Sequence, residues 1–255
     1  MTMITAANLA AAFDEVAPAY DFMVALNPGY HAHLRSAADA LVQWLPTSEP
    51  ISSSPLVRLL DLGCGSGAST RAVQEAAEAS DRRFLIVGID ASAGMLEQAR
   101  AKPWPDGVVF EVGQAEEIAE SSTPWGLVDR IHGAFAAYVF RNVSDRDAVL
   151  AGVFDLLSHD GVLVVQEYSI AGSRRAQLIW TLACWLVIIP LGWLTSRRTR
   201  LYRYLWRSVR SFDSIQTFVD RLYGAGFVDV EVRTMPGWQR GILHTVLARK
   251  PAVVS

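Results

Sequence analysis

The sequence predicts a doubly wound α/β domain with a mostly parallel sheet of seven strands. Three observations indicate this class: short apolar runs alternate with helical stretches, a glycine-rich turn follows the first run, and the last two runs have no helix between them. Strands joined by helical crossovers pair in parallel, whereas strands joined by a short loop pair antiparallel. A chain of 255 residues is long enough to bury one large core, and we expect a single domain over 1–255.

A helical segment is expected ahead of the sheet. Residues 8–45 carry apolar side chains at helical spacing, interrupted by the turn signal Asn27-Pro28-Gly29. We predict that they form a helical cap. A linker rich in proline and serine, from Pro46 to Pro55, leads from the cap into the first strand.

The central part of the chain, residues 56–170, predicts the parallel core of the sheet. Its short continuous apolar runs suit strands that are buried on both faces. The predicted strands are 56–60, 84–90, 108–112, 130–135 and 161–167, and helical patterns lie near 69–79, 95–99 and 145–157.

The last part of the chain, residues 212–250, predicts a helix at 212–223 and strands at 228–233 and 242–248. We expect these two strands to close onto the sheet edge as a hairpin. Between core and hairpin lies an insertion, 171–211, which is both apolar and rich in arginine.

Residues 176–196 of this insertion carry no charge, and arginines are dense over 174–210. A run of this length could just span a bilayer, but spanning would put the last two strands across the membrane from their sheet. Tryptophans flanked by arginines suit a helix at the membrane surface or an apolar lid over a substrate. A buried core helix or a homodimer contact stays as the alternative.

Composition limits the classes of partner. The net charge of −3 provides no positive field for nucleic acid. Two cysteines give no disulfide or zinc framework, and the first thirty residues lack a secretory signal pattern. We therefore expect a cytoplasmic protein. The apolar, arginine-rich insertion could in addition place it peripherally at the inner face of the cell membrane.

A ligand site is predicted where the first strand turns into a helix. The segment Asp61–Gly67 is Asp-Leu-Gly-Cys-Gly-Ser-Gly, and its glycines let a ligand approach the backbone closely. Asp90 ends the next strand, at the distance where a carboxylate accepts ribose hydroxyls. The glycines alone also fit the dinucleotide fingerprint of dehydrogenases.

Two sequence blocks together distinguish these classes. Asp61–Gly67 combined with Gly88-Ile89-Asp90-Ala91-Ser92 and Met95-Leu96 resembles class I methyltransferases that use S-adenosylmethionine, which have a Rossmann-like fold. Further segments resemble the ubiquinone/menaquinone biosynthesis C-methyltransferase family. These are Phe13–Asp21, Gly29–His31, Phe140–Asp145, Glu167–Ser169, Tyr202–Val209, Ala225–Phe227 and Gly241–His244.

The resemblance implies S-adenosylmethionine as cofactor, without a metal, and a set of cofactor contacts. These are Asp61, Gly63, Cys64, Gly65, Gly67, Asp90, Ala91, Met95, Gln114 and Ala115. Gln114 departs from the family pattern, which usually has an aspartate there for the adenine amino group. An amide oxygen still accepts that bond, but more weakly than a carboxylate.

Acceptor and catalytic residues are expected at the carboxyl ends of the later strands, where open α/β sheets bind ligands. Arg141 would hold a phenolate or quinone oxygen, and an ordinary salt bridge is its alternative role. Asn142 would contact the acceptor or cap the following helix. Glu167, at the end of the fifth strand, is a candidate base.

The cap contributes Tyr20 and His31 as candidate proton relays, although a lone histidine is more often a packing or surface residue. His244 is a similar candidate.

The function expected from these features is C-methylation of a quinol or phenol ring in a lipophilic acceptor of the menaquinone or ubiquinone type. Three alternatives remain at this point: O- or C-methylation of another hydrophobic metabolite or lipid, a nucleotide-dependent oxidoreductase, and a non-catalytic scaffold in quinone synthesis.

Overall fold

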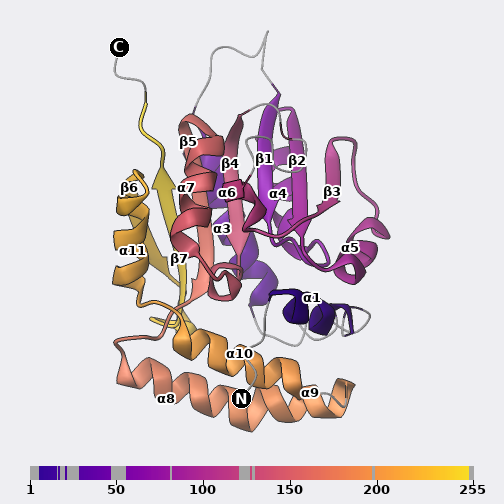
Figure 1. Ribbon diagram of the computed structural model, residues 1–255, viewed down its shortest axis with the longest axis vertical. Helices are drawn as coiled ribbons and strands as arrows, with labels where there is room; N and C mark the ends of the chain where they lie inside the picture. The colour runs from indigo at the N-terminus through magenta and orange to yellow at the C-terminus, as the bar shows by residue number, and fades with distance from the viewer. Residues whose placement is uncertain are drawn as a thin grey trace.

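A computed structural model describes residues 6–15, 17, 21, 29–46, 56–80, 82–120, 127, 130–196 and 199–252. Over these ranges the chain forms one central sheet with helices on both of its faces (Figure 1). The helices formed by residues 174–211 lie across one end of the sheet (Figure 1). The expected doubly wound α/β class is confirmed.

The sheet has seven strands in the order β3-β2-β1-β4-β5-β7-β6. The strands β1 to β5 are parallel to one another, while β7 runs antiparallel to both β5 and β6. The predicted terminal hairpin therefore forms at the sheet edge. The strands are β1 (Val57–Leu62), β2 (Phe84–Asp90), β3 (Val108–Val112), β4 (Ile131–Ala137), β5 (Leu157–Tyr168), β6 (Val228–Thr234) and β7 (Leu243–Arg249).

Strand ends differ from the predicted ones where pairing extends beyond the apolar run. The first strand continues to Leu62 because Asp61 pairs with Gly88 of β2. The fifth strand begins at Leu157, which pairs with Ile131, instead of at residue 161. Hydrogen bonding to a neighbouring strand, which apolar periodicity does not report, decides these ends.

Helices α3 (Tyr30–Trp44) and α4 (Ala68–Glu78) cover one face of the sheet, and α7 (Arg146–Leu156) and α11 (Ile215–Gly224) cover the other (Figure 1). Each face has its own core of fully buried aliphatic and aromatic side chains. The shorter α5 (Ala93–Arg100) packs beside β3, and α6 (Glu117–Glu120) packs against α7.

Within the described part of the predicted cap, helices α1 and α3 have different roles. The first, α1 (Ala6–Asp14), packs on α5, whereas α3 packs its buried side into the sheet core. Gly29 begins α3 with φ 87°, a left-handed conformation that glycine adopts without strain. The helical cap is thus partly a cover over the strand ends and partly core.

The insertion forms α8 (Arg174–Ala183), the π-helical turn η4 (Cys184–Ile188), α9 (Ile189–Ser196) and α10 (Arg200–Ser211). The stretch Arg174–Leu194 is long and apolar enough to cross a membrane, with a mean hydropathy of 1.8. Its inner side chains Trp180, Cys184 and Ile189 are buried with Tyr168 and Leu243 at the end of the sheet. This packing is the reason why the chain can return to form β6 and β7.

Candidate active site

The glycine loop after β1 folds back onto the neighbouring strand. The N–H groups of Gly63 and Cys64 donate to the carbonyl of Ile89, at 2.7 and 2.9 Å. Gly63 has φ 72°, and a Cβ placed on it would lie 2.3 Å from Cγ2 of Val139. Only glycine fits there, and the loop therefore keeps its backbone open along one wall of a cleft.

Asp90, at the end of β2, is held by backbone donors on both carboxylate oxygens. Oδ2 accepts from the N–H of Gly65 and Oδ1 from the N–H of Ser92, each at 2.8 Å. Burial raises the pKa of Asp90, and these two hydrogen bonds oppose the shift. The carboxylate lines the cleft, where its remaining lone pairs can accept hydroxyl groups.

Apolar side chains of α1 and the loop after β4 complete the cleft. Leu9, Ala10 and Phe13 lie on the α1 side, and Val139 and Val143 lie on the other. These side chains make this part of the cleft wall apolar.

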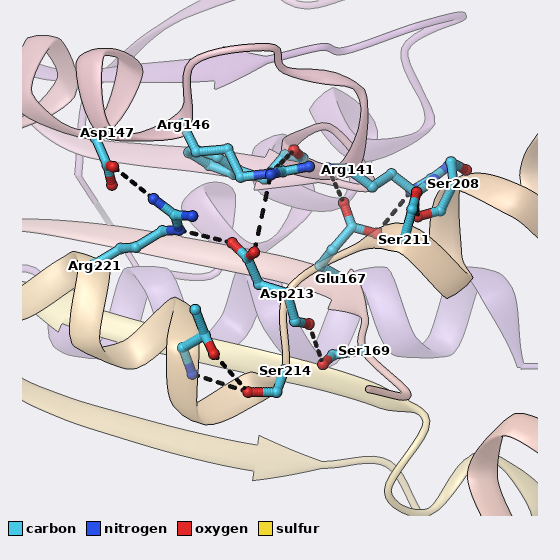
Figure 2. Close-up of polar contacts among 12 residues, drawn as sticks. Arg141, Arg146, Asp147, Glu167, Ser169, Ser208, Ser211, Asp213, Ser214 and Arg221 are labelled. Atoms are coloured by element: carbon cyan, nitrogen blue, oxygen red, sulfur yellow. Dashed lines mark hydrogen bonds and ion pairs between the residues drawn. The ribbon is translucent and has the colours of Figure 1, made fainter. Parts of the chain in front are cut away.

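A buried ion pair lies at the far end of the cleft. Nη1 of Arg141 is 2.7 Å from Oε1 of Glu167, and both side chains are less than 10% exposed. Arg141 sits on η3 (Phe140–Asn142) just after β4, and it lines the cleft. Figure 2 shows the two side chains pointing toward each other from neighbouring strand ends.

Aromatic rings flank this ion pair. Tyr138 stacks on Tyr30 of α3 with centroids 5.6 Å apart, and both residues line the cleft. The guanidinium of Arg141 lies 5.7 Å from the Tyr138 ring centroid. The φ of Tyr138 is 63°, which is unusual for a bulky residue and marks a backbone held by its surroundings.

Asn142 joins the cleft to the insertion. Its Oδ1 accepts from the hydroxyl of Tyr204 on α10 at 3.1 Å, and its Nδ2 donates to the carbonyl of Tyr138. The alternative role of helix cap is wrong, because Asp145 caps α7 by accepting from the N–H of Ala148.

The amino-acid sequence that forms this cleft matches the model of a known family. The model of the ubiE/COQ5 methyltransferase family covers residues 1–247. The chain belongs to this family. It is therefore a methyltransferase dependent on S-adenosylmethionine, and the oxidoreductase alternative is set aside.

Curated relatives align over most of their length. The ubiquinone/menaquinone biosynthesis C-methyltransferase UbiE of Campylobacter jejuni is 28% identical over 245 residues, which cover 93% of this chain and 95% of that protein. The protein of the same name from a Bradyrhizobium species is 30% identical over 232 residues, covering 88% and 85%. The demethylmenaquinone methyltransferase of Bacteroides fragilis is 26% identical over 225 residues, covering 88% and 85%.

Solved structures share the fold. The S-adenosylmethionine-dependent methyltransferase from Mesorhizobium loti superposes with a TM-score of 0.54 at 20% identity, covering 85% of this chain and 100% of that one. Human N-acetylserotonin methyltransferase, in complex with its cofactor, gives a TM-score of 0.56 at 17% identity, covering 91% and 55%. At these identities the likeness extends to the fold alone.

Most residues proposed to bind the cofactor do line the cleft. These are Gly63, Cys64, Gly65, Asp90, Ala91, Met95, Gln114 and Ala115. The open backbone of the glycine loop, beside a carboxylate fixed by two N–H donors, fits the ribose end of the family's cofactor.

Asp61 and Gly67, which were also predicted to contact the cofactor, are not among the residues that line the cleft. Asp61 is fully buried beneath the loop, where its Oδ2 accepts from the hydroxyls of Ser69 and Thr70 at 2.7 and 2.6 Å. Burial raises its pKa to about 6. Gly67 instead begins α4, and a Cβ on it would meet the ring of Trp104.

Cys64 is a loop residue whose thiol is buried, and burial raises its pKa well above the usual range. Because the thiolate is the nucleophilic form, this cysteine is unsuited to covalent catalysis.

Neither histidine candidate is among the residues that line the cleft. His31 is exposed on α3, edge-on to the cleft residue Tyr30 at 5.3 Å, and its role as a proton relay stays a prediction. His244 is buried in β7, burial lowers its pKa, and its Nδ1 has no hydrogen-bond partner among the described residues. Tyr20 lies outside the described residues.

Sequence reasoning missed the contacts that fasten the cap. Asp14, at the end of α1, accepts from the hydroxyl of Ser92 at 2.5 Å and from the N–H of Gly94 at 2.9 Å. Asp21 accepts from Ser66 of the glycine loop and pairs with Lys102 at 2.6 Å. The only signal was Asp21 itself, which ends the amino-terminal block that resembles the family.

Proposed function

We propose that this methyltransferase transfers a methyl group to a ring carbon of a lipophilic hydroquinone-type acceptor. The observation that carries the proposal is the far wall of the cleft, where the Arg141 guanidinium lies beside the ring of Tyr138. A cation there stabilises negative charge on a ring oxygen, and charge on that oxygen makes the neighbouring ring carbons nucleophilic. The names of the curated relatives point to the same acceptor class.

The residues at the near end of the cleft are suited to hold S-adenosylmethionine, which supplies an activated methyl group when bound. Asp90 has lone pairs available for the two ribose hydroxyls, since its N–H donors fix the carboxylate without neutralising it. Gln114, exposed on the cleft, can accept from the adenine amino group.

At the acceptor end, Glu167 acts as a positioning residue. Its Oε1 pairs with Arg141 and also accepts from the N–H of Tyr168 at 2.9 Å. This arrangement orients the guanidinium along the wall instead of presenting the carboxylate to a substrate. Arg141 is therefore the group that we expect to touch the acceptor oxygen, and Tyr30 and Tyr138 offer ring faces for packing.

The test is methyl transfer from isotopically labelled S-adenosylmethionine to a panel of acceptors. The panel contains a demethylmenaquinol analogue, simple phenols and a hydrophobic alcohol, and mass spectrometry locates the label. We expect label on a ring carbon of the quinol, and at least a hundredfold loss of kcat/KM in Arg141→Met, on the scale of one lost oxyanion donor. Arg35→Gln, an exposed arginine on α3, is the matched control and should retain full activity.

Label on an oxygen, or turnover with the alcohol alone, would show that the acceptor is another hydrophobic metabolite. Binding of S-adenosylhomocysteine without turnover on any acceptor would favour the scaffold alternative.

A further inference from the structure

The helical insertion has a charge of opposite sign to that of the rest of the chain. Residues 174–211 contain eight arginines and no aspartate or glutamate, whereas the whole chain has 23 basic and 26 acidic residues. The remaining chain therefore has 15 basic and 26 acidic residues, a net charge of −11 against +8 for the insertion. Such an asymmetry orients the molecule toward a negatively charged surface.

The outer side of α8, η4 and α9 is apolar and exposed. Leu178, Leu182 and Trp185 recur at the spacing of one helix face, opposite the buried Trp180 and Cys184. Only 22% of the apolar window within Arg174–Leu194 is buried. The most exposed side chains are Leu186 at 71%, Leu194 at 68%, Leu178 at 60%, Val187 at 58% and Trp193 at 54%.

A stripe of arginines on α10 borders this apolar face. Arg203, Arg207 and Arg210 are exposed and share one face of the helix by their spacing. The guanidinium of Arg210 lies 4.9 Å from the ring of Trp206, which in turn meets Trp185 edge-on at 5.7 Å. Apolar and basic side chains are therefore continuous from η4 to α10. Helices α8 and α10 run side by side at one end of the molecule (Figure 1).

We propose that this insertion face, made of the exposed side chains of α8 to α10, docks on the surface of a bilayer that contains anionic lipid. The apolar side chains enter the interface between headgroups and acyl chains, tryptophans occupy the headgroup level, and the arginines contact lipid phosphates. Spanning is excluded by the inner residues Trp180, Cys184 and Ile189, which are packed on the sheet end.

A second copy of the chain is a poorer occupant of this face. In a twofold dimer the same patch meets itself, so the arginines of one copy would lie against those of the other. An anionic lipid surface instead provides the opposite charge over the whole patch.

Docking would bring the cleft close to lipid-dissolved substrates. Tyr204 of α10 donates to Asn142 on the cleft wall, so that one helix carries both the arginine stripe and an acceptor-side contact. The chain leaves the insertion through Asp213, whose carbonyl accepts from Ser169 just after β5 (Figure 2). This relation to the acceptor rests on the proposed function, whereas docking itself does not.

The first test is flotation of the full chain with vesicles of phosphatidylcholine alone, or of phosphatidylcholine and phosphatidylglycerol in equal parts. We expect flotation with the anionic vesicles at low salt and its loss at high salt. Arg203→Gln/Arg207→Gln should weaken partitioning about thirtyfold, the factor given by about 1 kcal/mol per arginine near an anionic surface. The matched pair Arg35→Gln/Arg83→Gln, exposed elsewhere, should bind like the wild type.

The second test addresses the apolar contact. Leu186→Ser/Trp193→Ser should reduce partitioning about tenfold or more, since each side chain buries a large apolar area in the interface. Tyr223→Ser, half-exposed on α11, is the control. Because all of these positions are exposed, thermal unfolding of every variant should match that of the wild type, which separates loss of docking from loss of folding.

Absence of binding to either vesicle, or equal binding to both at all salt concentrations, would overturn the proposal. So would a stable dimer that Leu186→Ser/Trp193→Ser dissociates in sedimentation velocity, because the face would then be an interface between copies. Titration with S-adenosylhomocysteine, run in parallel without lipid, reports on the cofactor site alone. Failure of the methyltransfer proposal and failure of docking are thus distinguishable.

Discussion

The two ends of the cleft hold their carboxylates in opposite ways. At the cofactor end, Asp61 and Asp90 are bound by hydroxyl and N–H donors, and neither is ion-paired within the described part of the chain. At the acceptor end, Glu167 is paired with the guanidinium of Arg141. Neutral donors leave Asp90 free to recognise hydroxyl groups, whereas the ion pair fixes a cation on the wall where an acceptor oxygen would lie.

The two ends also differ in how the free-energy cost of burying charged groups is offset. Burial without a counter-ion raises the pKa of both aspartates at the cofactor end. The acceptor end instead depends on two buried charges that compensate each other, so removal of either one is severe.

The largest effect is expected from breaking the ion pair. Glu167→Gln leaves the Arg141 charge buried without the carboxylate, which should lower the free energy of unfolding by about 3–5 kcal/mol. Urea denaturation measures this change. The double variant Arg141→Met/Glu167→Gln should recover much of the loss, and a cost that stays additive in the double variant would show that the pair is not coupled.

The second effect is a pH dependence at the cofactor end. Burial raises the pKa of Asp61 to about 6, above its value in the unfolded chain, so the folded state binds the extra proton between about pH 4 and pH 6. The stability from this protonated carboxyl is present below about pH 4 and is lost as the pH rises through 6. Asp61→Asn does not titrate. Its stability relative to the wild type should rise over that window by up to about 3 kcal/mol, whereas a flat difference would contradict the raised pKa.

The third effect tests Asp90 as the cofactor anchor. Asp90→Ala should weaken S-adenosylhomocysteine binding about hundredfold, because hydrogen bonds to a charged acceptor contribute about 1.5–3 kcal/mol each. Calorimetric titration measures the loss. Glu116→Gln, a cleft carboxylate that accepts from Ser144, is the control and should bind within about threefold of the wild type. An equal loss of S-adenosylhomocysteine affinity in the two variants would show that Asp90 is not the cofactor anchor.

The smallest effect is expected where the insertion meets the acceptor end. Tyr204→Phe removes a single hydrogen bond to Asn142, so KM for the acceptor should rise about fivefold, on a scale of about 1 kcal/mol. Burial raises the pKa of Tyr204, and its hydroxyl remains a donor at neutral pH. Binding of S-adenosylhomocysteine should not change, and a parallel loss of cofactor affinity would refute the separation of the two ends.

Much of the cofactor end was predictable because the residues that form it lie close together in the sequence. The glycine loop and its strand and helix are contiguous, and Asp90 ends the very next strand. Strand runs 84–90 and 108–112 match the structure at both ends, since each is an apolar run bounded by turn residues. Only the first has a continuous run of buried residues, because 108–112 forms the edge strand β3, in which Phe110 alone is buried. The composition of the long insertion favoured a surface helix or a lid but left a buried helix open, and the exposed outer side chains were visible only in the structure.

The sequence by itself determined the α/β class, the parallel core, the glycine loop with Asp90 and the arginine-rich insertion. Only the tertiary structure decided that Asp61 turns beneath the loop, that His31 faces solvent, that Glu167 pairs with Arg141, and that Tyr204 reaches Asn142. The physical reason is that the direction in which each side chain points decides which residues it contacts. Side chains alternate across a strand and turn with the phase of a helix, and the neighbour that each one meets lies tens of positions away in the chain.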